Sequence, residues 1–281
     1  MRLKSLFSRT FHKGPNHRIV AMNEKIDDLL PPPFEWVEIP GGRVSVEDAS
    51  GPYAGRGTKG GTYEIPAFAI AKYPVTNAQY AKFIEAGGYQ VEQWWTKTGW
   101  QTKNSRGNRW NSPLDWNDEQ INRPNNPVVG VSWYEALAFS LWLSEGTGDH
   151  IRLPTEQQWL RAMTGDNRWN FPWGNTWDSS RCNNSVEANS ADTTPVTQYP
   201  AGASPYGVMD LVGNVWEWCL TQWYVEGNDL EGNEGRVLHG GSFHSINKGS
   251  SQFRATVRMG RGEQNREKMF GFRTAATLVA D

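Results

Sequence analysis

The residues best suited to bind a metal ion lie in one short segment, residues 204–218. Asp210 and Glu217 supply two carboxylates, and Gly213 between them allows a sharp turn that points backbone carbonyls toward the same space. This set suits Ca²⁺, because that hard ion takes roughly six to eight oxygen ligands. A solvated turn has the same composition, so the segment by itself also fits an ordinary loop.

Patterns for other kinds of catalysis are missing. The five histidines include no pair at the helical spacing of a zinc site, and neither a Gly-x-Ser-x-Gly turn nor a Gly-x-x-x-x-Gly-Lys loop is present. The sequence therefore supports neither a zinc hydrolase, nor a serine hydrolase, nor a nucleotide hydrolase. His239 and His244 flank two glycines and could share a site.

A series of blocks resembles the formylglycine-generating-enzyme (sulfatase-modifying factor) family. Residues 206–218, which read YGVMDLVGNVWEW, look like the family signature. Further blocks follow in the family's order at residues 73–80, 127–133, 152–156, 171–175, 194–196, 236–243 and 271–273. The resemblance covers the chain from residue 34 onward. It implies an α+β fold of the C-type-lectin-like, formylglycine-generating-enzyme type, with few helices, a small twisted antiparallel sheet, many loops and bound calcium.

The resemblance also implies where structural calcium would bind. Side chains at the positions of Asp210 and Glu217, with backbone oxygens at those of Gly213 and Val215, form the family's calcium loop, and both carboxylates are present.

A second, weaker calcium site of the family would fall on Asn183, Asn184 and the loop to Ser190. The acidic ligand expected near Ala188 is missing there.

The copper site of the family is not preserved. The enzyme that gives the family its name oxidises a substrate cysteine with copper held by two cysteines just after a Gly-Gly-Ser-aromatic motif. The matching positions are Ser245 and Ser250, and a hydroxyl is too hard and weak a donor to replace thiolate on Cu(I). Cys182 and Cys219 lie elsewhere, and Cys219 is expected to be a buried structural thiol. We therefore expect no copper and no formylglycine-generating activity.

Other family members are iron oxygenases of sulfur metabolism, with iron held by histidines on a separate helical domain. No such domain precedes residue 34, so this activity is not expected either. A third branch consists of binding proteins, including variable proteins diversified by retroelements, in which the stretch between Gly-Gly-Ser and Gly-Phe-Arg forms an exposed ligand face. Here that stretch is residues 243–270, with long polar and cationic side chains that suit a macromolecule or an anionic ligand. The candidate ligand-binding residues are Phe243, His244, Asn247, Lys248, Gln252, Arg254, Arg258, Arg261, Glu263, Asn265, Arg266 and Lys268.

Two hypotheses follow. The first is a non-catalytic ligand- or protein-binding module on a calcium-stabilised scaffold, with an unknown protein or small molecule as partner. The alternative is a metal-dependent oxidoreductase that modifies a peptide or a small thiol, with a site around His239, His244 and Ser245.

Local sequence patterns predict some of the helices and strands that position these residues. Three helix starts carry capping boxes, in which the first side chain caps the helix and the third following residue reaches back: Thr76 with Gln79, Ser132 with Glu135, and Thr155 with Gln158. Residues 36–39 and 43–46 look like arms of a hairpin, and residues 63–70 like one strand interrupted at Pro66. No helix is expected after residue 166.

Composition bounds the remaining possibilities. The 281 residues include 28 basic and 30 acidic side chains, a balance that argues against nucleic-acid binding. No apolar run approaches the roughly 20 residues of a membrane span. With two cysteines and no secretory signal pattern, the cytoplasm is the expected compartment. Residues 1–33 are expected to be a basic, flexible arm that ends in three prolines, and residues 34–281 to be one domain.

Overall fold

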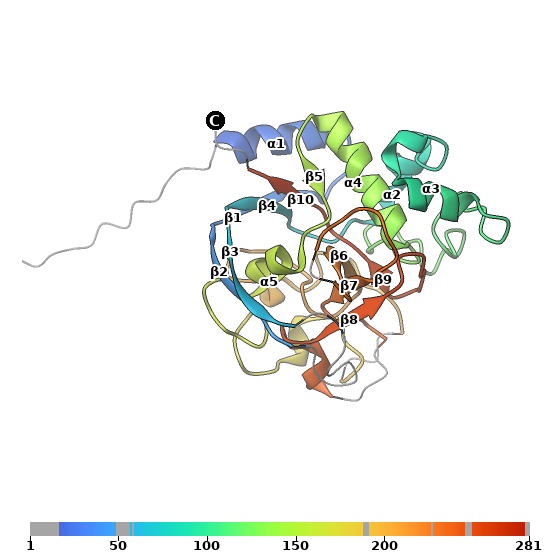
Figure 1. Cartoon of the computed structure of the whole chain (residues 1–281). Helices are drawn as coiled ribbons and strands as arrows, with labels where there is room; N and C mark the ends of the chain where they lie inside the picture. The colour runs from blue at the N-terminus through green and yellow to red at the C-terminus, as the bar shows by residue number, and fades with distance from the viewer. Residues whose placement is uncertain are drawn as a thin grey trace, which may run out of the picture.

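The computed structural model describes residues 17–48, 57, 59–187, 191–225, 227–244 and 249–278. These residues form five α-helices: α1 (His17–Asp27), α2 (Asn77–Glu85), α3 (Lys97–Asn104), α4 (Trp133–Thr147) and α5 (Glu156–Thr164). The strands are β1 (Trp36–Ile39), β2 (Gly42–Val46), β3 (Gly61–Ile65), β4 (Phe68–Ala71), β5 (Ile151–Arg152), β6 (Trp216–Gln222), β7 (Arg236–His239), β8 (Arg258–Arg261), β9 (Phe270–Gly271) and β10 (Ala275–Thr277). Few helices and short, mostly antiparallel strands confirm the expected α+β class (Figure 1).

The three capping boxes are confirmed. At α2, the Thr76 hydroxyl accepts from the Gln79 backbone N–H, and the Gln79 side chain accepts from the Thr76 N–H at 3.0 Å. The same reciprocal pair starts α4 and α5. Each box satisfies backbone donors that the first helical turn leaves free, so these three helices begin where the sequence places them. After residue 166 the only helical segments among the described residues are single turns of 3₁₀ helix.

The expected hairpin is wrong. β1 pairs with β4 and β2 pairs with β3, so the two runs that are adjacent in sequence belong to different sheets. The turn between them is held by Arg161, whose guanidinium donates to the carbonyls of Pro40 and Gly41 at 3.2 and 3.3 Å. The run 63–70 also divides at Pro66. Its first part, β3, pairs with β2, and its second part, β4, joins the sheet β1-β4-β10-β5.

The third sheet, in the order β8-β7-β6-β9, lies at the centre of the molecule (Figure 1). Every residue of β6 is buried, and its neighbours β7 and β9 run antiparallel and parallel to it. The residues that follow β7, and those between β8 and β9, therefore connect strands of the sheet that contains this buried strand. These connections carry most of the stretch predicted to bind ligand.

The N-terminal arm is part of the body from residue 17 onward, which corrects the boundary expected at residue 33. Met22, Ile26 and Leu30 are buried in the same core as α4, and Figure 1 shows α1 and α4 together on one side of the molecule. The Asn23 side chain accepts from the backbone N–H of Trp36 at 2.7 Å. Residues 1–16 lie outside the described residues.

No helix among the described residues has both the length and the apolar content to cross a membrane; the longest, α4, has 15 residues.

Candidate functional site

The Gly-Gly-Ser-aromatic motif forms the turn after β7. Gly240 and Gly241 have positive φ angles of 100° and 75°, and a Cβ on Gly241 would lie 2.6 Å from the ring of Phe253. Glycine alone meets both conditions without strain. The buried Phe243 donates its backbone N–H to the Asn214 carbonyl at 3.0 Å, so the motif lies beside the predicted calcium loop.

The segment after this motif is described in part. Ser245, Asn247 and Lys248 lie outside the described residues, so the first of the two expected cysteine positions is not placed. The second, Ser250, begins the 3₁₀ turn η5 (Ser250–Phe253) and is partly exposed.

The two histidines of the alternative site differ in environment. His239 is 1% exposed; its Nε2 lies 2.8 Å from Glu156 Oε1, and its ring stacks on Trp159. The other oxygen of Glu156 accepts from Arg258 at 2.8 Å. Burial raises the pKa of Glu156, but the hydrogen bonds and charges of His239 and Arg258 outweigh burial and leave that pKa below its ordinary value. His244, by contrast, is exposed.

The predicted calcium loop is organised around the side chain of Asn214. Its amide nitrogen donates to Asp210 Oδ2 at 2.8 Å and to the Thr194 carbonyl at 3.0 Å. Its oxygen accepts from the Thr194 N–H at 3.0 Å and from the Asn183 side chain at 3.2 Å. Gly213 turns with φ of 76°, and a Cβ there would lie 2.2 Å from the Asn183 carbonyl oxygen. The two loops predicted to bind separate calcium ions are therefore in direct contact.

Glu217, the second expected carboxylate, already accepts hydrogen bonds from two side chains, those of Arg273 and Trp159. Arg273 binds it through both ends, with Nε 2.6 Å from Oε2 and Nη2 2.7 Å from Oε1. The Trp159 indole N–H donates to Oε2 at 2.8 Å. All three side chains are buried, so this bidentate ion pair fixes β6 to the residues after β9.

The oxygens of the loop fit a hard cation in part. Asp210 Oδ1 and Asn183 Oδ1 are buried and have no hydrogen-bond partner, which is the condition a calcium ion would relieve. Burial raises the pKa of Asp210 to about 7 in the absence of a cation. Because Glu217 is already paired with Arg273, Asp210 would be the negatively charged ligand of a cation bound here. Val215, a predicted backbone ligand, is fully buried.

In the second predicted loop, Asn183 Oδ1 is a buried side-chain oxygen without a hydrogen-bond partner. Asn184 is buried, and its side-chain oxygen accepts from the backbone N–H groups of Val186 and Glu187 at 3.0 and 3.2 Å. Its amide donates to the carbonyls of Ser179 and Cys182. Asn184 is thus a loop-forming residue through its side chain, and Ser190 lies outside the described residues. No cluster of three or more His, Cys, Asp or Glu suited to a metal occurs in the described part of the chain.

Both cysteines are buried and protonated at neutral pH. Burial raises the pKa of Cys182 to about 12 and that of Cys219 well above its ordinary value. The expectation that Cys219 is a buried thiol is confirmed. Because the thiolate is the form that binds metals and attacks substrates, neither cysteine is available for such chemistry in the folded protein.

The predicted ligand face of residues 243–270 is narrower than expected, because several of its polar side chains point inward. Gln252, Arg258 and Glu263 are buried. Glu263 pairs with Arg236, whose guanidinium lies 3.8 Å from the ring centroid of Trp133. Glu263 and Arg236 are thus paired inside the fold and are not presented to a ligand.

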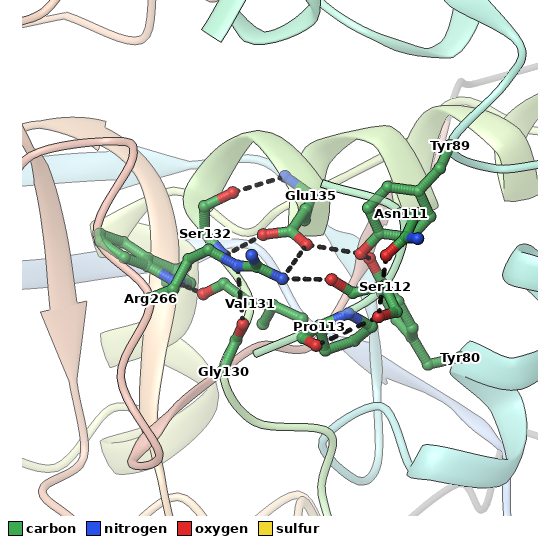
Figure 2. A network of polar contacts seen from close by, with 11 residues as sticks. Tyr80, Tyr89, Asn111, Ser112, Pro113, Gly130, Val131, Ser132, Glu135 and Arg266 are labelled. Carbon is green, nitrogen blue, oxygen red and sulfur yellow. Dashed lines mark hydrogen bonds and ion pairs between the residues drawn. The ribbon is translucent and has the colours of Figure 1, made fainter. Parts of the chain in front are cut away.

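Arg266 also turns inward, toward a buried carboxylate on α4 (Figure 2). Its Nη2 lies 3.0 Å from Glu135 Oε1, which also accepts from the Tyr89 hydroxyl at 2.5 Å. Arg266 donates to the carbonyls of Gly130, at 3.1 Å, and Ser112. Burial raises the pKa of Glu135, and the charge of Arg266 offsets part of that rise. The sequence marked Glu135 only as a capping residue; its pairing with Arg266 spans 131 positions and left no local signal.

The exposed remainder of the stretch forms two patches. Residues 262–269 lie against the segment 110–116, since Lys268 pairs with Asp115 at 3.4 Å and the Arg266 guanidinium lies 4.8 Å from the ring centroid of Trp110. Residues 249–256 lie against the loop 170–177, where Phe253 stacks on Trp177. The predicted binding residues that keep exposed or partly exposed side chains are His244, Arg254, Arg261, Asn265, Arg266 and Lys268.

Comparison with known proteins places this geometry in a family. Residues 29–278 match the model of the sulfatase-modifying factor enzyme 1-like domain. The inactive C-alpha-formylglycine-generating enzyme 2 of Bos taurus is 31% identical over 278 residues, covering 85% of this chain and 87% of that protein. The hercynine oxygenase of Mycolicibacterium smegmatis is 35% identical over 168 residues, but these cover 55% of this chain and 37% of the oxygenase. The chain thus spans well under half the length of that relative.

Solved structures share the fold at low sequence identity. PvdO from Pseudomonas aeruginosa superposes with a TM-score of 0.63 at 20% identity, covering 87% of this chain and 94% of PvdO. Treponema denticola variable protein 1 gives 0.60 at 19% identity, covering 86% and 95%. These likenesses cover 87% and 86% of this chain, and the family match includes both the predicted calcium-loop segment and the Gly-Gly-Ser turn. The chain belongs to the sulfatase-modifying factor family, as its sequence blocks indicated.

Proposed function

We propose that this chain is a non-catalytic binding module on a C-type-lectin-like scaffold, with its ligand face on the exposed part of residues 243–270. One observation carries the proposal: serines stand at both positions where the family's copper cysteines would lie, and the two cysteines that remain are buried. Burial raises the pKa of both thiols, so neither offers Cu(I) a thiolate at neutral pH.

The binding role is supported by the charge of the face. Arg254 is exposed at the end of η5, and His244 is exposed after the Gly-Gly-Ser turn. Arginine forms two parallel hydrogen bonds with carboxylate or phosphate groups, so the face suits an acidic ligand or protein segment. A family relative of similar length is named inactive, and a structure with this fold is named a variable protein; both support a role without the copper reaction.

A calcium ion that braces the scaffold is part of the same proposal. Asp210 Oδ1 and Asn183 Oδ1 would supply side-chain oxygens to it, and the backbone turn at Gly213 would help to shape the site. When bound, the ion would supply charge compensation for Asp210 and rigidity for the loop beside the face. Glu217 would act indirectly, by anchoring β6 through Arg273.

A metal-dependent oxidoreductase acting on a peptide or small thiol, with a site around His239, His244 and Ser245, is the second candidate. The identity shared with a hercynine oxygenase favours it, and so does the buried His239 Nδ1, which lacks a hydrogen-bond partner. Against it stands the engagement of His239 Nε2 by Glu156, which leaves one ring nitrogen for a metal. The binding module therefore remains the proposal that the geometry supports best.

Peptide and glycan arrays test the proposal. The wild-type chain is compared with Arg254→Ala and with Arg106→Ala, a control that removes the same charge from another exposed position. We expect a ligand whose signal is lost in Arg254→Ala and retained in Arg106→Ala. A ligand indifferent to Arg254, or the absence of any array ligand, contradicts the proposed face. Stoichiometric copper or iron that is lost in His244→Ala would instead support the oxidoreductase.

A further inference from the structure

A cavity of about 470 Å³ lies on the loop 173–187, outside the proposed ligand face. Its volume falls within the range of roughly 300–1,000 Å³ that is usual for small-molecule sites. It is lined by Trp173, Asn175, Thr176, Trp177, Asp178, Ser179, Arg181 and Glu187. Neither His244 nor Arg254 lines it, so the inference does not rest on the proposed ligand face.

The aromatic walls of the cavity are held in place before any ligand arrives. The Trp173 indole N–H donates to the Thr176 carbonyl at 3.0 Å, and its ring stacks on Phe171 with centroids 5.6 Å apart. Trp177 stacks on Phe253 at 5.1 Å. The Trp173 and Trp177 rings meet at 48° with centroids 6.2 Å apart, so they form an angled pair. A ligand therefore meets rigid indole surfaces and orders few side chains on binding.

The charge of the lining is negative. Asp178 and Glu187 contribute two carboxylates and Arg181 one guanidinium, so the lining carries one net negative charge. Arg181 compensates Asp178, with Nε 2.9 Å from Oδ2. Glu187 accepts from the Ser179 hydroxyl at 2.5 Å, and it forms no ion pair within the described part of the chain. The Glu187 carboxylate thus has no counter-charge within the described part of the chain, in a lining that also contains two indoles.

We propose that this cavity binds an organic cation, specifically a substituted ammonium group. The face of an indole ring attracts a cation, and the uncompensated carboxylate adds a favourable charge interaction. The Arg181 guanidinium lies 5.9 Å from the Trp173 centroid and is paired with Asp178, so its own charge is compensated within the lining. An anionic ligand would meet the negative charge of Glu187, and a neutral one would gain nothing from it.

Calorimetric titration of the full chain with choline chloride tests the inference. The matched control ligand is 3,3-dimethyl-1-butanol, which has the same shape without the charge. The informative variant is Glu187→Gln, because this exposed side chain can change without disturbing the fold, and Glu92→Gln is the control at another exposed carboxylate. We expect saturable binding of choline, no binding of the alcohol, and affinity weakened about three- to five-fold in Glu187→Gln but not in Glu92→Gln.

The ammonium group could belong to a free molecule or to a peptide side chain, so a peptide with trimethyllysine is titrated in parallel. Tighter binding of the peptide identifies a protein ligand, and equal or weaker binding identifies a small molecule. The inference is overturned if neither cation shows saturable binding, if the alcohol binds as well as choline, or if Glu187→Gln binds choline as the wild type does. Because Arg254 does not line the cavity, loss of array binding in Arg254→Ala would leave this result unchanged.

Discussion

Replacing Arg266 by leucine should destabilise the protein strongly at neutral pH. The change removes the only positive charge that contacts the Glu135 carboxylate within the described residues, and it leaves that carboxylate buried with Tyr89 and the Ser132 N–H as donors. Removing one member of a buried ion pair costs about 3–5 kcal/mol, because the other charge stays in a poorly solvated site. Arg266 is only 12% exposed, so solvent screens the pair little.

Urea or thermal unfolding of the two proteins measures this cost. For a chain of this length each kcal/mol corresponds to about 2–4 °C in Tm, so the variant should melt roughly 6–20 °C lower. Lys268→Leu is the matched control: its partner Asp115 is 3.4 Å away, but the lysine is 58% exposed, and loss of such a pair should cost at most about 1 kcal/mol.

The pH dependence of the loss gives a second, independent check. Burial already raises the pKa of Glu135, and without Arg266 that pKa rises further. A carboxyl group whose pKa is raised by folding stabilises the folded state fully below its unfolded pKa of about 4.3, and this contribution disappears as the pH rises through the folded value. The difference between variant and wild type should therefore shrink from pH 8 toward pH 5. A loss below about 1 kcal/mol at pH 7.5, or one that is equal at pH 8 and pH 5, would refute the role assigned to this pair.

Three further results are expected. Gly241→Ala should lower the free energy of unfolding by about 1–3 kcal/mol in urea titrations, since φ there is positive and the new methyl group meets Phe253; an unchanged midpoint would contradict this. A thiol reagent should leave Cys182 and Cys219 unmodified in the native protein and label both in denaturant, because burial raises their pKa. Chelation should lower the Tm of calcium-loaded protein but not that of Asp210→Asn; no change in the wild type would remove the proposed ion.

The helices could be predicted because their signals are local. Each capping box consists of two residues three positions apart, so Ser132 and Glu135 or Thr155 and Gln158 mark a helix start without reference to the rest of the fold. The separation of β1 and β2 into different sheets could not be predicted in the same way. The carbonyls of the turn between them accept hydrogen bonds from Arg161, which lies 121 positions from Pro40, and no local pattern reveals such a donor.

In the candidate site, too, the features with local sequence signals could be predicted, and the contacts between distant residues could not. The glycine turn and the residues of the predicted calcium loop lie in contiguous blocks of the sequence, and these blocks indicated the family. The orientation of Arg258 and Arg266 was missed, because a polar side chain in the sequence gives no sign of a buried partner. Glu156 lies 102 positions from Arg258, and Glu135 lies 131 positions from Arg266. The sequence of residues 243–270 therefore predicts a continuous polar face, although several of its polar side chains are buried.

The most direct test of the account uses copper and a cysteine-containing peptide. The purified chain is loaded with Cu(I), incubated with the peptide in the presence of oxygen, and the peptide is then analysed by mass spectrometry for conversion of its cysteine to an aldehyde. With serine at positions 245 and 250 and both native thiols buried, the account predicts that the peptide is recovered unchanged. Aldehyde formation that depends on this chain would contradict it.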